Sequence, residues 1–311
     1  MIFYVQKAMI EEAKELSYEQ FWSKYDIHDV CNLMGLPINT PQAVYKHLHR
    51  ALVRDLSNWE ECSIKTTTKG NQPKFYSVTE KAFIKLRFRY EGVLWHDELV
   101  EVFASDMFCD KFATPVVKQL PVLTDKGWGV YSEDFAQDAT FIPFYTLLET
   151  SSAIYPVKKP EKRFAFIKDL MSEITGLDVT DYLVTMMLTD TIVLNEDRHL
   201  NNLGVMYDAG KYAIAPIFDY GLGMFEGDPK YDRFKRNGNL TYALNSVKSI
   251  PFFSKPFANI KGLCRLGYSD ILSNYIDKLD IPDDSLFPNS LSAKYVTTVL
   301  DKLRSIVYVQ D

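Results

Sequence analysis

The sequence has few cysteines and no long apolar run. Its four cysteines form no CxxC pair and no metal-ligand spacing, so we expect free thiols in a reducing cytoplasm. No run of about 18 apolar residues occurs, which argues against a transmembrane helix. The N-terminus meets acidic residues by Glu11 and lacks the pattern of a signal peptide. These absences predict a cytoplasmic protein that does not enter a membrane.

The chain also lacks an excess of basic residues. Its net charge is −6 at pH 7, so a general nucleic-acid-binding surface is not expected. Apolar residues make up 47% and charged residues 24%, which is ordinary for a globular protein. A chain of 311 residues can form one large domain or two lobes with a substantial core.

Residues 1–60 have the apolar periodicity of helices, and Thr40 followed by Pro41 signals a helix start. The pattern resembles a helix-turn-helix. Its second helix would present to DNA the basic residues Lys46, His47, His49, Arg50 and Arg54. The range 1–60 nevertheless holds six Lys and Arg against eight Asp and Glu, a net charge of −2. We therefore favour a helical extension that packs on the next lobe, with direct nucleic-acid binding as the alternative.

Residues 61–135 mix strand-like and helix-like patterns, which predicts a small α+β lobe. The segment 81–92 alternates, with Ile84 and Leu86 on one face and Lys85 and Arg87 on the other, which is typical of a half-buried strand. A helical pattern follows over 95–112, and the turn Asp-Lys-Gly at 125–127 predicts a hairpin. From residue 136 to residue 311 the chain is mainly helical, and residues 178–194 predict a buried helix.

The segment 193–221, VLNEDRHLNNLGVMYDAGKYAIAPIFDYG, interrupts apolar runs with carboxylates and asparagines. Asn202 follows Asp197 by five residues, and Asp219 ends an apolar run as Phe-Asp-Tyr-Gly. The residues between them predict a hairpin that brings Asn202 next to Asp219. Protein kinases use an Asp, an Asn five residues later and a second Asp before a Gly-containing turn. Singly, such residues are more often structural, but this combination is rare.

With Asp-Arg-His-x-x-Asn-x-Gly at 197–204 and Pro-Ile-Phe-Asp-x-Gly at 216–221, the chain resembles the HipA-like serine/threonine kinases. A weaker likeness covers roughly residues 62–260 and includes 132–135 and 254–257. The resemblance implies a two-lobed, protein-kinase-like α+β fold. A helical N-terminal extension over 1–60 would precede a small α+β N-lobe over 61–135 and a mainly helical C-lobe over 136–311.

The resemblance also implies roles for the residues of the two motifs. Asp197 would be the catalytic base, or the carboxylate that positions the acceptor hydroxyl. Asn202 and Asp219 would bind Mg²⁺, whose preference is for carboxylate and amide oxygens. Arg198 and His199 occupy the family's Arg-His positions and would brace the loop or lie next to the phosphates.

A kinase also needs a strand lysine that touches the phosphates and a helix glutamate that holds it. Lys85 fits the first role because its face alternates away from the apolar one, although a lysine on such a strand is usually only solvated. The family pattern resembles Glu-Val-Phe-Ala-Ser, which selects Glu101 as its partner. Glu98 lies three residues earlier on the same helical face and stays an alternative.

The chain lacks both glycine-rich phosphate loops, GxGxxG and GxxxxGK[ST]. HipA-like kinases use a different loop at this place, which puts phosphate contacts here at Thr67, Thr68, Lys69 and Gly70. The hydroxyls of 63–68 are candidate autophosphorylation sites or simply loop residues. The adenine is expected at the segment that joins the lobes, which consists of Ser132, Glu133, Asp134 and Phe135.

The resulting hypothesis is an ATP- and Mg²⁺-dependent serine/threonine protein kinase that autophosphorylates and acts on a protein substrate, as a toxin or regulatory kinase. Family members often pair with an antitoxin or DNA-binding partner protein, so the resemblance implies such a partner here. Two alternatives stay open. One is a DNA-binding regulator with a degenerate kinase lobe, and the other is a kinase of the same fold that acts on a small molecule.

Overall fold

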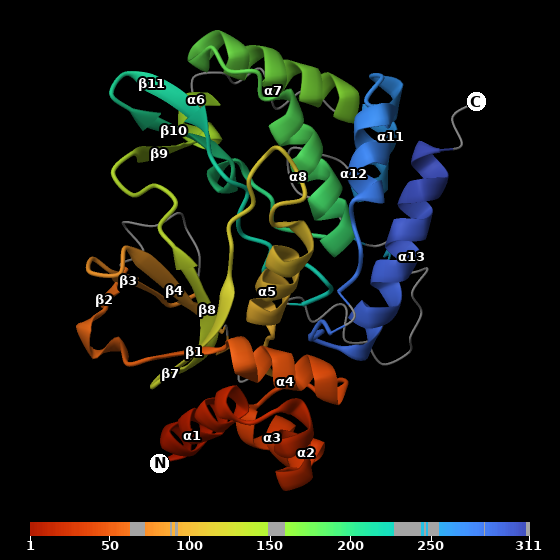
Figure 1. Ribbon diagram of the computed structural model, residues 1–311. Coiled ribbons are helices and arrows are strands. Elements are labelled where there is room, and N and C mark those ends of the chain that lie inside the picture. The colour runs from red at the N-terminus through yellow and green to blue at the C-terminus, as the bar shows by residue number, and fades with distance from the viewer. Residues whose placement is uncertain are drawn as a thin grey trace.

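The computed structural model describes residues 1–62, 72–87, 89–90, 93–148, 159–226, 244–245, 247, 255–282 and 284–308. Figure 1 shows the first helices at one end of the molecule, below a twisted sheet, and the last helices along the side away from that sheet. One helix, α5 (Asp97–Phe108), lies between the sheet and these last helices.

The chain begins with an N-terminal helical unit, which we define as residues 2–50. Three of its helices start at side-chain caps, because Ser17, Asp26 and Thr40 accept hydrogen bonds from first-turn N–H groups. The apolar faces meet in one core with Phe21 at its centre. The last of these helices ends at Arg50, so the helical segment is shorter than the expected range 1–60. The helices are α1 (Ile2–Glu15), α2 (Tyr18–Lys24), α3 (Ile27–Met34) and α4 (Pro41–Arg50).

A six-stranded sheet follows, in the order β1-β7-β8-β4-β3-β2. Only the pair β1–β7 is parallel within it. The expected hairpin is β7–β8, with Thr124 opposite Gly127. The expected alternation is present in β4, where Ile84 is buried and Lys85 is half-buried. The strands are β1 (Leu52–Arg54), β2 (Glu60–Glu61), β3 (Lys74–Ser77), β4 (Ala82–Leu86), β7 (Leu120–Thr124) and β8 (Gly127–Glu133).

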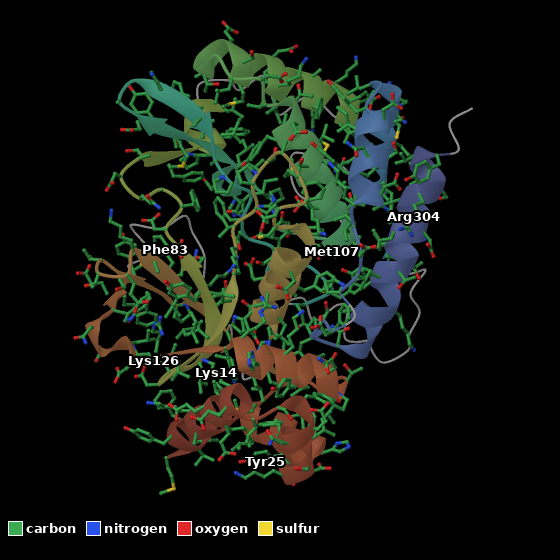
Figure 2. All side chains as sticks on the ribbon, viewed as in Figure 1. Lys14, Tyr25, Phe83, Met107, Lys126 and Arg304 are labelled. Carbon is green, nitrogen blue, oxygen red and sulfur yellow. The ribbon has the colours of Figure 1, made fainter. Side chains whose placement is uncertain are left out.

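The strand predicted over 81–92 is interrupted. β4 ends at Leu86, and the short strands β5 (Arg89–Tyr90) and β6 (Val93–Leu94) form a separate two-stranded ribbon. A 3₁₀ turn over Leu56–Asn58 lies between β1 and β2. The predicted helix is α5, whose side chains are almost all buried. Figure 2 shows Met107 of α5 between the sheet and the later helices, and this residue belongs to the largest apolar core.

The rest of the chain is mainly helical. The predicted buried helix is α8, in which every residue from Tyr182 to Val193 is buried. The predicted hairpin is β10–β11, and β9 adds a third strand to it. The elements are β9 (Thr140–Pro143), α6 (Phe144–Leu148), α7 (Pro160–Thr175), α8 (Thr180–Val193), a 3₁₀ turn (Leu200–Asn202), β10 (Gly204–Asp208), β11 (Lys211–Ile214), α11 (Pro256–Arg265), α12 (Ser269–Asp277) and α13 (Ser290–Val307).

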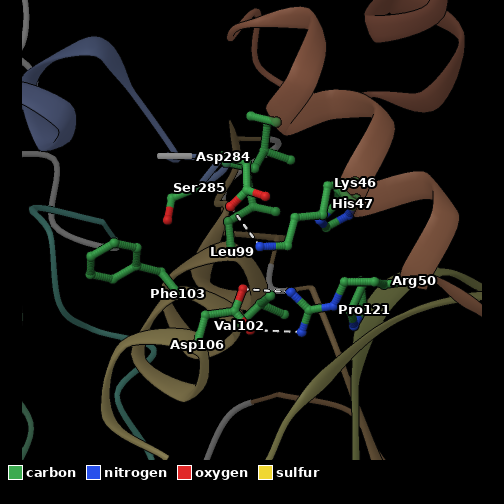
Figure 3. A pocket seen from close by; sticks show the side chains of 12 residues that line it. Lys46, His47, Arg50, Leu99, Val102, Phe103, Asp106, Pro121, Asp284 and Ser285 are labelled. Carbon is green, nitrogen blue, oxygen red and sulfur yellow. Dashed lines mark hydrogen bonds and ion pairs between the residues drawn. The ribbon is translucent and has the colours of Figure 1, made fainter. Parts of the chain in front are cut away.

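Helix α4 faces the rest of the chain rather than open space. Arg50 forms a two-bond fork with Asp106 of α5, at 2.6 and 2.7 Å, and Lys46 lies 2.6 Å from Asp284 (Figure 3). His47 is buried against the ring of Trp128. Three of the basic side chains that a DNA-reading helix would present are thus engaged within the molecule.

Among the residues that the structure describes, no helix combines the length and apolar character needed to cross a membrane.

Candidate active site

Lys85 lies at the point where the sheet, α5 and the mainly helical part meet. Its Nζ is 3.0 Å from Oε1 of Glu101 and 2.8 Å from Oδ1 of Asp219. Glu101 is 1% exposed, and its other oxygen accepts hydrogen bonds from the side chain of Gln119 and the backbone N–H of Tyr220, both at 2.9 Å. Burial alone would lower the pKa of Lys85, but the two carboxylates raise it well above its usual value.

The segment before Asp219 pairs with a distant part of the chain. Ile217 donates to the carbonyl of Pro115 and accepts from the N–H of Val117, both at 2.9 Å. Asp219 itself has φ 68°, a left-handed conformation that non-glycine residues adopt mainly where the surroundings hold them. A Cβ at Gly221 would lie 3.3 Å from Nζ of Lys85 and from Oε1 of Glu101. Glycine in Phe-Asp-Tyr-Gly therefore leaves room for the ion pair.

Asn195 ties the Asp197 loop to Asp219. Its buried side chain donates to Asp190 at 3.0 Å and to the carbonyl of Asp219 at 3.2 Å. Its oxygen accepts the backbone N–H of Asp197 at 3.0 Å. One amide therefore sets the relative position of the two aspartates. Asn195 was not among the predicted site residues, although its polar partner Asp190, in a helix that is buried and mostly apolar, is a signal visible in the sequence.

Arg198 braces the same loop from inside. Its side chain is 2% exposed, pairs with Asp190 at 2.9 Å and lies over the ring of Tyr220 at 4.9 Å. It also donates to the carbonyl of Asn202 at 3.4 Å and to that of Phe218. These contacts brace the loop, and the two carbonyls bonded by Arg198 bring Asn202 and Asp219 to the same region.

Asn202 has a feature that fits a metal ligand. It is 1% exposed, yet its side-chain oxygen has no hydrogen-bond partner. An unpaired buried oxygen is costly unless a ligand satisfies it. Within the described part of the chain, no group of three or more His, Cys, Asp or Glu could hold a metal. Two oxygens from Asn202 and Asp219 suit Mg²⁺, because this ion usually keeps waters and substrate phosphates as its other ligands.

The carboxylate of Asp197 lies at the open side of this group and is 50% exposed. Partial burial raises the pKa of Asp197, while the neighbouring His199 opposes the shift and the charge of Asp219 adds to it. Nε2 of His199 is 3.9 Å from Oδ2 of Asp197, and its Nδ1 is buried without a hydrogen-bond partner. An exposed carboxylate in this position can reach an acceptor that arrives from solvent.

A cleft of about 450 Å³ opens beside Lys85 and Asp219. Its volume lies within the range of small-molecule and cofactor sites, roughly 300–1,000 Å³. The residues expected near adenine, Ser132 to Phe135, line it, and Phe135 packs on Phe218 with ring centroids 5.4 Å apart. Lys74 lies opposite Lys85 on β3 and lines the same cleft. The expected phosphate contacts at Thr67, Thr68, Lys69 and Gly70 lie outside the described residues.

The two candidate partners of Lys85 have different neighbours. Glu101 contacts Lys85, whereas Glu98 pairs with Arg87. Both glutamates are 1% exposed and lie on the same face of α5, which is why their sequence spacing could not separate them. Gln119, which holds the second oxygen of Glu101, was also missed, because nothing in its local sequence marks it.

The sheet with α5, the mainly helical part and the cleft between them form a two-lobed, kinase-like α+β fold. The crystal structure of the Helicobacter pylori proinflammatory kinase CtkA is similar over 83% of this chain and 99% of that chain, with a TM-score of 0.60 and 16% identity. The Shewanella oneidensis MR-1 toxin–antitoxin complex of HipA, HipB and operator DNA matches over 80% of this chain and 66% of that chain, with a TM-score of 0.40 and 15% identity.

No protein-family model matches the sequence, and no curated protein is significantly similar to it. At 16% identity the likeness to CtkA establishes the fold. The expected two-lobed, kinase-like fold is confirmed.

Proposed function

We propose that the chain is an ATP- and Mg²⁺-dependent protein kinase that transfers the γ-phosphoryl group of ATP to a serine or threonine hydroxyl. The observation that carries the proposal is the position of Lys85, which contacts both Glu101 and Asp219 at the end of a nucleotide-sized cleft. A structural lysine would need only one of these two carboxylates. The kinase-like fold supports the same conclusion, since it is the fold in which such an arrangement binds phosphates.

Each residue of the site has a task in this reaction. Lys85, held by Glu101, would bind the phosphates and neutralise their charge. Asn202 and Asp219 would hold Mg²⁺, which supplies further neutralisation when it is bound. The segment 132–135 would contact the adenine along the wall of the cleft.

Asp197 would act on the acceptor. Its half-exposed carboxylate is open to solvent, so a serine or threonine side chain of another protein can approach it. The carboxylate would orient the hydroxyl and accept its proton as the phosphoryl group is transferred. The backbone of Asp197 is held by Asn195, so the carboxylate is positioned before the acceptor arrives.

The test is mass spectrometry of the protein and of added protein acceptors after incubation with Mg·ATP. We expect phosphate on serine or threonine in the wild type and none with Asp197→Asn or Asp219→Asn, while circular dichroism shows an unchanged fold. Asp208→Asn is the matched control, because Asp208 is an exposed residue of the β10–β11 hairpin. Undiminished transfer by either site variant would overturn the assignment.

The same incubation, together with assays of ATP binding and DNA retardation, separates the remaining interpretations. A small-molecule kinase would turn over ATP only when its own acceptor is added and would leave protein hydroxyls unmodified. A DNA-binding regulator would fail to bind ATP and would retard DNA with a steep dependence on salt. An antitoxin or DNA-binding partner protein stays a prediction from the sequence resemblance.

A further inference from the structure

Helix α5 forms one ion pair with Lys85 of β4 and a second with Arg87, the residue that follows the end of β4. In the second, Nε of Arg87 donates to Oε1 of Glu98 at 2.8 Å, and Nη2 donates to the same oxygen. Arg87 follows Lys85 by two residues, and Glu98 precedes Glu101 by three. The backbone N–H of Arg87 continues the pairing of β4 with β8, so Arg87 and Lys85 share one face, as Glu98 and Glu101 share one face of α5, and the two pairs are neighbours.

The Arg87–Glu98 pair is more deeply buried than the first one. The side chains of Arg87 and Glu98 are 5% and 1% exposed, against 16% for Lys85. Burial alone would raise the pKa of Glu98, but the guanidinium of Arg87 and the neighbouring imidazole of His96 lower it to about 2. The carboxylate of Glu98 is therefore held in its charged form in a place that is almost closed to solvent.

The guanidinium of Arg87 is also fixed from the side opposite α5. Its Nη1 donates to the carbonyl of Gly35 at 2.7 Å, and Gly35 ends α3 in a left-handed conformation. The backbone N–H of Arg87 donates to the carbonyl of Trp128 at 2.8 Å, and the indole of Trp128 donates to Met34 at 2.7 Å. Arg87 thus connects β4, α5 and the N-terminal helical unit.

We propose that Arg87 and Glu98 are positioning residues, which set the distance and rotation between β4 and α5 at which Lys85 meets Glu101. β4 is held in the sheet by β3 and β8, so a single ion pair would still let α5 turn about the contact, whereas two neighbouring pairs fix both the distance and the rotation of α5. The inference rests on the proposed function, because the Lys85–Glu101 pair is assigned there to the phosphates. It also couples the N-terminal helical unit to the active site through Gly35 and Arg87.

The test compares two double variants on the same helix. Arg87→Met with Glu98→Gln removes both charges, because removing one alone would leave the other buried and unpaired. Arg50→Met with Asp106→Asn is the matched control, which removes a forked ion pair from α5 at a position five residues beyond Glu101. Measurements are kcat and KM for Mg·ATP, with the melting temperature of each protein.

We expect the Arg87–Glu98 variant to lose about 10- to 100-fold in kcat, the loss that a small misplacement of a catalytic group causes. Its KM should change much less, and Arg87→Lys, which keeps the charge beside Glu98, should recover most of the lost kcat. The control variant should melt at a lower temperature with a nearly unchanged kcat. A wild-type kcat in the first variant, or an equal loss in both, would overturn the positioning role.

A second measurement does not depend on activity. Lys85 paired with Glu101 should react slowly with an amine-reactive ester, because protonated amines are unreactive. Mass spectrometry of the peptide that contains Lys85 should show faster acylation in the Arg87–Glu98 variant than in the wild type or the control. Equal rates in all three proteins would contradict the proposal. If the wild type transfers no phosphate, the proposed function fails, and the acylation rates still decide the role of Arg87 and Glu98.

Discussion

At the scale of single residues, the site combines satisfied and unsatisfied polar groups. Glu101 has partners for both oxygens, and Asn195 uses both its nitrogen and its oxygen. Asn202 differs, because its buried oxygen has no partner. Buried polar atoms in folded proteins are nearly always paired, so an exception inside a candidate site indicates a missing ligand. Nδ1 of His199 and Oε1 of Gln119 are also buried without a partner, but only Asn202 combines an unpaired oxygen, the atom type that Mg²⁺ prefers, with the +5 spacing from Asp197.

Asn202→Ala is expected to raise the Mg²⁺ concentration for half-maximal phosphoryl transfer by about tenfold or more, since even residues behind metal ligands have effects of this size. The free energy of unfolding without ligands should change by less than about 1 kcal/mol, because the substitution removes one long hydrogen bond, at 3.3 Å, to the carbonyl of Asp197. The measurements are Mg²⁺ titrations of activity and thermal melts with and without Mg·ATP.

Asn201→Ala is the control for this prediction, because Asn201 is the adjacent, half-buried asparagine of the same turn. It should keep the wild-type Mg²⁺ dependence. If the two variants needed the same Mg²⁺ concentration, Asn202 would not be a metal ligand.

Much of the site could be predicted from local spacing. The +5 interval from Asp197 to Asn202 lies within one loop, and the hairpin β10–β11 carries the chain back towards Asp219. Gln119 could not be found this way, because its partner Glu101 is 18 residues away, and the local bonds of Asn195 to Asp190 and Asp197 do not reveal its contact with Asp219, which is 24 residues away. Such contacts follow from how whole elements pack, which no local pattern encodes.

At the scale of elements, α4 shows both what sequence patterns predict and where they stop. Thr40 and Pro41 predicted its start, since a cap and a first-turn proline act within one turn. Its docking on α5 and β8 could not be predicted, because the contacts of Arg50 and His47 span 56 and 81 residues. The pairing of β1 with β7 could not be predicted for the same reason, since it joins residues about 70 positions apart.

The docked position of α4 predicts a pH dependence of stability. Burial lowers the pKa of His47 from its usual 6.5 to about 3. The unfolded chain takes up a proton at His47 below pH 6.5, while the folded chain does not until about pH 3. The stabilising contribution is therefore complete above pH 6.5 and is lost as pH falls, at up to about 1.4 kcal/mol per pH unit.

Chemical unfolding between about pH 7 and about pH 5, where histidine is the side chain that ordinarily titrates, measures this effect. The free energy of unfolding should fall less steeply with acidification in His47→Gln than in the wild type. His49→Gln, at an exposed position on the same helix, should follow the wild-type slope. If the free energy of unfolding fell equally steeply with pH in all three proteins, His47 would not take up a proton when the chain unfolds.

At the scale of the whole molecule, the N-terminal helical unit shares its core with the rest of the chain. The apolar cluster around Phe21 also contains Leu99 of α5, Trp128 of β8 and Leu286 near the start of α13. Asn39 bonds Phe287 twice, since its side chain donates to the carbonyl of Phe287 and accepts its N–H, both at 3.1 Å. The N-terminal helical unit therefore contacts the sheet, the helix that carries Glu101 and the segment before the last helix.

A shared core of this kind predicts one cooperative unfolding transition rather than separate melting of the first 50 residues. Tryptophan fluorescence, which senses Trp22 in the helical unit and Trp128 in the sheet, should change together with far-ultraviolet circular dichroism. Asn39→Ala should lower the free energy of unfolding in that single transition by about 1–2 kcal/mol, because the side chain loses its two hydrogen bonds to Phe287 and a third to the carbonyl of Pro37. Asn32→Ala, at an exposed position on α3, should leave the midpoint unchanged or slightly higher, since alanine favours helix. Two resolved transitions would mean that the unit is an independent domain, and its coupling to Lys85 through Arg87 could then be broken without unfolding the kinase-like fold.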